Sequence, residues 1–208
     1  MQKTSEQKQL TRVDKPFSEP CERNKGPILA VLRQVFAQPA RILEIGSGTG
    51  QHAVHFGAAL PHVVWQTSDL PANHPGIRAW IEEAALPNVP APVALDVNGP
   101  WPLQTYDGVF TANTLHIVSW ALAQKLVAGA AALLEEGGRL VIYGPFNYGG
   151  AFTSASNARF DEWLKARDPL SGIRDFEAVA KCAEINGLHM RADHAMPANN
   201  RLLVFAKK

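Results

Sequence analysis

The chain has 208 residues, of which 46% are hydrophobic, and its formal net charge at pH 7 is +1. This length accommodates one well-buried core and is too short for two ordinary domains with a linker, so the sequence predicts a single domain over residues 1–208. A near-neutral charge without a long run of lysine or arginine lacks the electrostatic footprint of a dedicated nucleic-acid binder and favours a small-molecule ligand.

The sequence also limits the compartment and the metal chemistry. No apolar stretch is long enough to cross a bilayer, and the segment from Met1 to Lys15 is polar, unlike a signal peptide with an apolar centre. We therefore expect a cytoplasmic protein without a membrane partner. Cys21 and Cys182 are too few for a disulfide framework or a cysteine-based zinc site, so we assign no redox role and no metal site. The oligomeric state stays open.

The predicted elements begin with a polar N-terminal arm over residues 1–20, followed by a helix from Pro27 whose apolar residues recur at helical spacing until Pro39. Short apolar runs then alternate with helical patterns, which is typical of a parallel sheet with helices on both faces. The predicted strands are 42–45, 63–67, 93–97, 106–112 and 139–143. The helices between them are 52–60, 77–85 and a segment from Leu122 that ends at Gly137 and Gly138.

The pattern changes in the last third of the chain. Residues 146–174 form a predicted insertion, and Phe160, Trp163 and Leu164 give it a small amphipathic helix suited to covering a substrate pocket. After a helix over 176–185, the strands 188–195 and 201–206 are separated by too few residues for a crossover helix. These two strands should form an antiparallel hairpin at the edge of the sheet.

A glycine-rich turn directly follows the first predicted strand and is the main functional motif: Gly46, Ser47, Gly48 and Gly50. Such a turn at a helix start lets the backbone approach a ligand closely and is expected to place unpaired N–H groups beside it. A dinucleotide motif usually has its third glycine where this chain has Gln51, which disfavours a pyrophosphate ligand. Glu44, at the strand end, suits a cationic or amine-bearing ligand.

The pattern Glu-x-Gly-x-Gly-x-Gly over residues 44–50 resembles the first motif of class I S-adenosylmethionine-dependent methyltransferases. Several segments together resemble the methyltransferase-like twenty-six group: 17–29, 43–52, 113–117, 143–150, 156–161, 171–175 and 196–204. The resemblance implies an α/β, Rossmann-like class I fold with a mostly parallel seven-stranded sheet and an antiparallel C-terminal edge hairpin. It also implies S-adenosylmethionine as methyl donor, and the group has no settled acceptor.

Candidate cofactor contacts follow the strands, because ligands of open parallel sheets lie across the carboxyl ends of the strands. Asp69 is expected to accept hydrogen bonds from ribose hydroxyls, with a helix cap or turn as the alternative role. Asp96 and Val97 are candidates for the adenine, unless their segment is simply a turn. Asn24 is a candidate for the methionine carboxylate of the cofactor, and Asn113 is a further candidate cofactor contact near the methyl group.

The catalytic candidates lie where the methyl group and the acceptor would meet. His116 has a side chain that titrates near neutral pH and could remove a proton from the acceptor, although a histidine between apolar neighbours is often structural. Tyr148, in an aromatic loop after the fifth strand, could line the pocket or simply pack within a rigid loop. We rank His116, Asn113 and Tyr148, in that order, as candidates for proton removal and acceptor orientation.

The sequence therefore predicts a methyltransferase that acts on a small-molecule acceptor by in-line methyl transfer. One alternative is a non-catalytic regulatory module that binds S-adenosylmethionine or S-adenosylhomocysteine. Another is a nicotinamide-dependent oxidoreductase. Methylation of RNA or protein is less favoured, because a near-neutral chain offers little attraction to phosphate.

Overall fold

The computed structural model describes residues 15–208, which form six α-helices and eight strands. The helices are α1 (Glu19–Val35), α2 (Gln51–Ala59), α3 (His74–Ala84), α4 (Trp120–Leu133), α5 (Ala155–Arg167) and α6 (Phe176–Ile185). The strands are β1 (Ala40–Ile45), β2 (Val63–Asp69), β3 (Val93–Ala94), β4 (Tyr106–Ala112), β5 (Leu134–Asn147), β6 (Arg174–Asp175), β7 (Leu188–Met196) and β8 (Asn200–Lys207). Within the described part of the chain, none of these helices combines the length and the apolar character needed to span a membrane.

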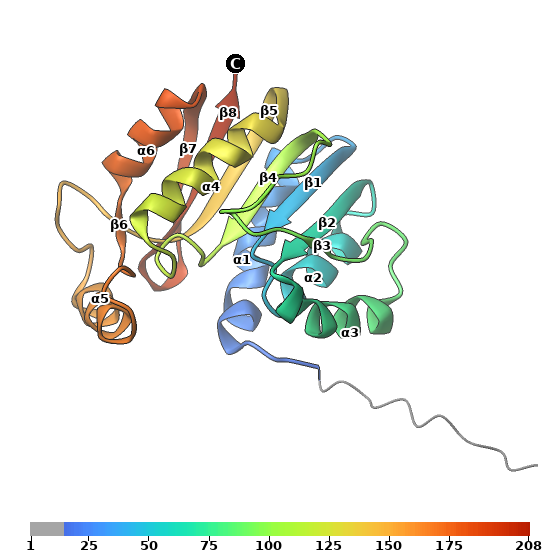
Figure 1. The fold of residues 1–208 in the computed structure, drawn as a ribbon, viewed down its shortest axis with the longest axis horizontal. Coiled ribbons are helices and arrows are strands. Elements are labelled where there is room, and N and C mark those ends of the chain that lie inside the picture. Colours follow the sequence, from blue (N-terminus) through green and yellow to red (C-terminus); the bar gives the residue numbers. More distant parts are fainter. Residues whose placement is uncertain (1–14) are drawn as a thin grey trace, which may run out of the picture.

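The sheet has the predicted topology. Its strand order is β3-β2-β1-β4-β5-β8-β7, with β6 pairing β5 outside this path. The strands from β3 to β5 pair in parallel, whereas β8 is antiparallel to both β5 and β7. In Figure 1, β8 runs upward to the C-terminus, so the parallel strands end at the lower edge of the view. The mostly parallel α/β sheet with an antiparallel edge hairpin is confirmed, and the two-residue strand β6 is an addition.

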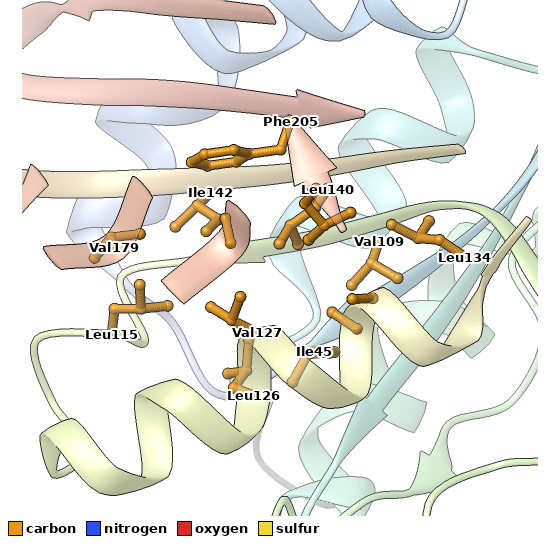
Figure 2. Close-up of a cluster of buried hydrophobic side chains, with 14 of the residues drawn as sticks. Ile45, Val109, Leu115, Leu126, Val127, Leu134, Leu140, Ile142, Val179 and Phe205 are labelled. Atoms are coloured by element: carbon orange, nitrogen blue, oxygen red, sulfur yellow. The ribbon is translucent and has the colours of Figure 1, made fainter. Parts of the chain in front are cut away.

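Two buried clusters, one on each face of the sheet, form the core. The first joins the sheet to α4 and α6; Figure 2 shows Val127 of α4 and Val179 of α6 near Ile142 and Phe205 of the sheet. The second cluster joins the opposite face to α1 and α2. Burying apolar side chains on both faces explains why the strands are continuously apolar rather than alternating. Helix α5 belongs to neither layer and lies below the strand ends (Figure 1).

The first helix begins earlier than predicted. The hydroxyl of Ser18 accepts a hydrogen bond from the backbone N–H of Cys21 at 3.4 Å, which caps α1 at its N-terminus. Pro27, where the sequence placed the start, lies inside the helix. The predicted start was wrong because the capping serine lies upstream of the apolar periodicity. Residues 1–14 of the predicted arm lie outside the described residues.

The described end of the arm packs against the sheet's helices. The indole N–H of Trp80 in α3 donates to the backbone carbonyl of Pro16 at 2.7 Å. Two residues later, the N–H of Ser18 donates to the side-chain oxygen of Gln51, at the start of α2, at 2.6 Å. Residues 15–18 therefore connect α3, α2 and α1 along the lower edge of the sheet (Figure 1).

The boundary between α4 and β5 also differs from the prediction. Helix α4 ends at Leu133, and β5 starts at Leu134, which pairs with Tyr106 of β4. The register between β4 and β5 then shifts, so that Gly108 pairs with Arg139. The residues between these two pairs form a bulge, which contains Gly137 with φ +76°. Strand pairing, which local periodicity does not report, ends the helix before the glycines.

Candidate functional site

The turn after β1 requires glycine at three positions, since Gly46, Gly48 and Gly50 have φ values of +73°, +58° and +89°. A Cβ on Gly50 would lie 3.1 Å from the backbone of Ile77 in α3, so this glycine allows α3 to approach the turn. A Cβ on Gly48 would meet no atom within 4 Å. Gly48 is therefore the open point of the turn, where a side chain would occupy space that a ligand can use.

The amides of this turn are already paired. The N–H groups of Gly46 and Ser47 both donate to the carbonyl of Ser68 at 3.0 Å, and the N–H of Gly48 donates to Asp69. The prediction of unpaired N–H groups is therefore wrong for these three amides. Their partners hold the turn against the end of β2, which gives it a fixed shape before any ligand binds.

Asp69 lies beside the turn, as predicted, and its carboxylate has three donors. Its Oδ2 accepts from the N–H of Gly48 at 2.7 Å, and its Oδ1 accepts from the N–H of Leu70 at 2.7 Å and from the side chain of Asn73 at 2.8 Å. A carboxylate offers about four acceptor positions. Asp69 therefore serves as a turn residue and retains capacity for one further donor.

Glu44 lies beneath the turn and not at its surface, with 2% of its surface exposed. Its Oε2 accepts from the indole N–H of Trp65 at 3.1 Å, and its Oε1 lies 4.0 Å from Nδ1 of His52. Burial raises the pKa of Glu44 to about 7, against the opposing hydrogen bonds from Trp65 and Ser47. The carboxyl is therefore close to its midpoint of ionisation at neutral pH.

Asn24 of α1 and His52 of α2 continue this buried polar group. Nε2 of His52 lies 2.7 Å from the side-chain oxygen of Asn24, and both residues are buried. Burial lowers the pKa of His52 to about 4, so the ring is neutral at neutral pH. Because the Asn24 oxygen accepts, Nε2 carries the proton and Nδ1 faces Glu44 as an acceptor. His52 was not predicted as a site residue, because its place beside Glu44 depends on how α1 and α2 pack.

The segment after β3 forms a turn. The side chain of Asp96 accepts from the N–H of Asn98 at 2.8 Å, and its backbone carbonyl accepts from the N–H of Gly99 at 2.8 Å. Asp96 is exposed and Val97 is half-buried. β3 pairs with β2, with Ala94 opposite Asp69, so both candidates for adenine lie at the same edge of the sheet as Asp69.

Asn113 follows β4 and has φ +57°, a left-handed conformation that non-glycine residues rarely adopt. Its N–H donates to the carbonyl of Tyr143 at 2.9 Å. Thr111, just before it, donates its hydroxyl proton to the carbonyl of Ile45 at 2.9 Å and so links β4 to β1 just before the glycine turn. Asparagine tolerates this conformation better than most residues, which explains why it occupies this position.

His116 is buried under α5. Its ring lies 5.3 Å from the ring of Phe160, edge to face, and only 5% of its surface is exposed. Burial, and to a smaller extent the charge of Arg174, lowers the pKa of His116 to about 4. The imidazole is therefore neutral at neutral pH, which leaves a lone pair available, but it is a weak base.

The predicted insertion contains α5 and is fastened to the loop after β4. The carboxylate of Asp161, 3% exposed, accepts from the N–H of Ile173 at 2.7 Å. The guanidinium of Arg174 donates to the carbonyl of Leu115 at 3.0 Å and also to that of Val118. These contacts make α5 a fixed cover over His116.

Tyr148 follows β5, and its hydroxyl donates to Oδ2 of Asp193 at 2.7 Å. Its ring stacks on Phe176 with centroids 4.9 Å apart. Burial is the main cause that raises the pKa of Tyr148. Beside it, the side-chain oxygen of Asn147 is buried and has no hydrogen-bond partner within residues 15–208. Neither Asp193 nor Asn147 was predicted as a site residue from the sequence.

A parallel sheet in this strand order, closed by an antiparallel hairpin and carrying a glycine turn after β1, is the class I methyltransferase fold. The chain belongs to the family described as protein of unknown function (DUF938), whose family model matches residues 15–207. The predicted fold class is thereby confirmed, and the narrower resemblance to the methyltransferase-like twenty-six group stays a prediction.

Solved structures with this fold include an O-methyltransferase family protein from Burkholderia thailandensis, with a TM-score of 0.80 and 20% identity over 90% of this chain and 57% of that one. An O-methyltransferase family 2 protein from Planctomyces limnophilus, in complex with apigenin, gives a TM-score of 0.74 at 16% identity, over 88% and 62%. The structure of PigF with SAH gives a TM-score of 0.75 at 18% sequence identity, over 91% of this chain and 64% of that one. The chain thus spans between 57% and 64% of the length of these proteins.

Proposed function

We propose that this protein is an S-adenosylmethionine-dependent methyltransferase that acts on a small-molecule acceptor by in-line methyl transfer. The single observation that supports this most is the juxtaposition of the open glycine, Gly48, with the carboxylate of Asp69 at the carboxyl ends of β1 and β2. Bare backbone and an adjacent carboxylate are the chemistry that a nucleoside ligand requires, because ribose hydroxyls donate to the acid.

We assign the other candidate cofactor residues to the remaining parts of the same ligand. Asp96 and the backbone of Val97 would contact the adenine. Asn24 would contact the methionine carboxylate, Asn113 would lie near the methyl group, and Glu44 would present a partly ionised carboxyl from beneath the turn. The bound cofactor supplies a methyl group that is already activated on a sulfonium, so the protein's main task is to hold the acceptor at reaction distance.

The chain's own residues then position the acceptor and move a proton where one must leave. His116 is neutral and can accept a proton, which is needed only when the acceptor arrives protonated. Asn113, in its fixed left-handed conformation, would orient the acceptor. Tyr148 would act by orientation too, because Asp193 already holds its hydroxyl proton.

Binding and turnover need separate tests. Calorimetry with S-adenosylhomocysteine and with NADH should give binding to the first compound only. Tight binding of NADH alone would instead support an oxidoreductase. Cofactor binding with no labelled product, in a screen of thiols, amines, phenols and carboxylic acids with labelled methyl donor, would support the alternative of a non-catalytic regulatory module.

A further inference from the structure

A cavity of about 420 Å³ opens at the carboxyl end of β5, between the tip of the β7–β8 hairpin and the segment before α5. Its walls include Tyr148, Thr153, Met196 and Arg201. The volume suits a small organic molecule. None of the candidate cofactor residues lines it, so this space is separate from the proposed cofactor contacts.

Within residues 15–208, the hydrogen bonds of the Arg201 guanidinium lie on one edge only. Its Nε donates to Oδ1 of Asp193 at 2.7 Å, and its Nη2 donates to the backbone carbonyl of Asp193 at 3.2 Å. Tyr148 holds the second oxygen of the same carboxylate, and the guanidinium lies 5.6 Å from the Tyr148 ring centre. A guanidinium carries five N–H donors, so the edge that faces away from Asp193 keeps donors for a ligand.

Asn199, at the hairpin tip, also lines the cavity. Ala198 and Asn199 have φ values of +56° and +58°, a left-handed backbone that asparagine tolerates and that is costly for alanine. α5 supports this tip, because the side chain of Asn157 donates to the Asn199 carbonyl at 3.3 Å and the side chain of Asn199 donates to Ser156 at 3.3 Å. The cavity is therefore built jointly by the hairpin and the insertion that covers His116.

The cavity lies close to the expected reaction centre. The N–H of Asn113 donates to the carbonyl of Tyr143, and Tyr143 pairs with Leu202 of β8. Arg201 directly precedes Leu202 in β8. Adjacent strands are about 4.8 Å apart, so the backbones of Asn113 and Arg201 are separated by roughly two strand spacings. One small acceptor molecule can span that distance.

We propose that this cavity is the acceptor subsite and that it selects small carboxylic acids with an apolar body. The free edge of Arg201 would bind the acceptor carboxylate in two parallel hydrogen bonds, and Met196 and the Tyr148 ring would contact the apolar body. A single negative charge fits best, since Asp193 beside Arg201 would repel a phosphate dianion. This inference rests on the proposed function.

Benzoate and its uncharged counterpart benzamide test the selectivity. In nuclear magnetic resonance titrations of the full chain, benzoate should shift the backbone signals of Tyr148 and Arg201 and bind about tenfold or more tightly than benzamide. Equal affinity for the two compounds would overturn the proposal. Titration with S-adenosylhomocysteine in the same samples tests the proposed function separately, because its signals are expected at the glycine turn.

Two variants test the location. Arg201→Gln should lower benzoate affinity about tenfold or more, whereas Arg191→Gln, an exposed arginine of β7 outside the cavity, should leave it unchanged. Ala195→Trp fills the cavity from an exposed position and should abolish binding even if Arg201→Gln fails to fold. Benzoate binding that survives in folded Arg201→Gln or Ala195→Trp protein would refute the assignment.

Discussion

The carboxylate of Asp69 accepts a hydrogen bond from the backbone N–H of Gly48 at 2.7 Å, which joins the end of β2 to the open glycine of the turn after β1. The same acid is our candidate for the ribose hydroxyls. Its position therefore serves two ends, because it holds the turn in shape and keeps a negative charge where a nucleoside would lie.

Replacing this acid should weaken the cofactor site. Asp69→Asn puts an amide where a carboxylate now accepts from Gly48, and it removes the charge that would strengthen hydrogen bonds from ribose. We expect S-adenosylhomocysteine affinity, measured by calorimetry, to fall about tenfold or more.

Asp107→Asn is the matched control for that substitution. The carboxylate of Asp107 also accepts a backbone N–H at 2.7 Å, from Arg41, but at the amino ends of the strands. The control should bind S-adenosylhomocysteine as the unaltered protein does. Equal affinity in both variants would remove Asp69 from the site.

A side chain at the open glycine should have two separable effects. Gly48→Ala forces a Cβ onto a residue with φ +58° and into the space next to the turn. Gly137→Ala meets the same backbone penalty, at φ +76°, with no atom within 4 Å, in the bulge of β5. Each should lose about 1 kcal/mol of unfolding free energy.

Only Gly48→Ala should also lose cofactor affinity. Urea denaturation and calorimetry on both alanine variants measure the two effects independently. If Gly137→Ala lost as much affinity as Gly48→Ala, the loss would report general strain and not a ligand contact.

Glu44 should make stability depend on pH. Its pKa is about 7 in the folded protein because of burial, against an ordinary value of 4.5, so the folded chain binds a proton that the unfolded chain releases between these values. The contribution of Glu44 to the free energy of unfolding is fully present below pH 4.5 and is lost as the pH rises to about 7. The free energy of unfolding of the unaltered protein, relative to Glu44→Gln, should therefore fall by on the order of 3 kcal/mol across this window.

The comparison of the two proteins isolates Glu44. His52 and His116 have lowered pKa values, so their contributions change in the opposite sense, rising as the pH increases from about 4 to 6.5, and they are present in both proteins. Urea denaturation at a series of pH values gives both curves. Parallel curves would mean that Glu44 is solvated and ionised throughout.

The His116 ring should remain neutral at pH values well below the usual pKa of histidine. We expect its ring to titrate with a midpoint of about 4, because burial under α5 disfavours the charged form. Nuclear magnetic resonance of nitrogen-labelled histidine measures this, and Asn substitution of His116 identifies its signals. A midpoint near 6.5 would show that α5 does not cover the ring.

The order of elements was predictable because most residues of β1, β2 and β4 and of the second half of β5 are buried, and burial leaves a continuous apolar signal in the sequence. The boundaries of the helices and strands were less predictable. Ser18, and not Pro27, begins α1, and the pairing of Leu134 with Tyr106 ends α4 before the glycines. Caps and strand partners are contacts with particular atoms, whereas periodicity reports only which residues avoid water.

Some residues of the candidate site were also predictable from the sequence, whereas others were placed only by packing. Gly46, Gly48 and Gly50 were identifiable because a left-handed backbone demands glycine, and Asp69 because a strand end lies at a regular distance from that turn. The packing of α1 on α2 decided that Glu44 lies beneath the turn beside His52.

The sequence by itself determined the sheet, the glycine turn and the acid beside it, because each depends on local backbone geometry and on burial. Only the tertiary structure decided that Tyr148 meets the Asp193–Arg201 pair beside one cavity, since Tyr148 precedes Asp193 by 45 residues in the chain. Such contacts depend on pairing β5 with β8 and β8 with β7, and strand register leaves no local signal in the order of residues.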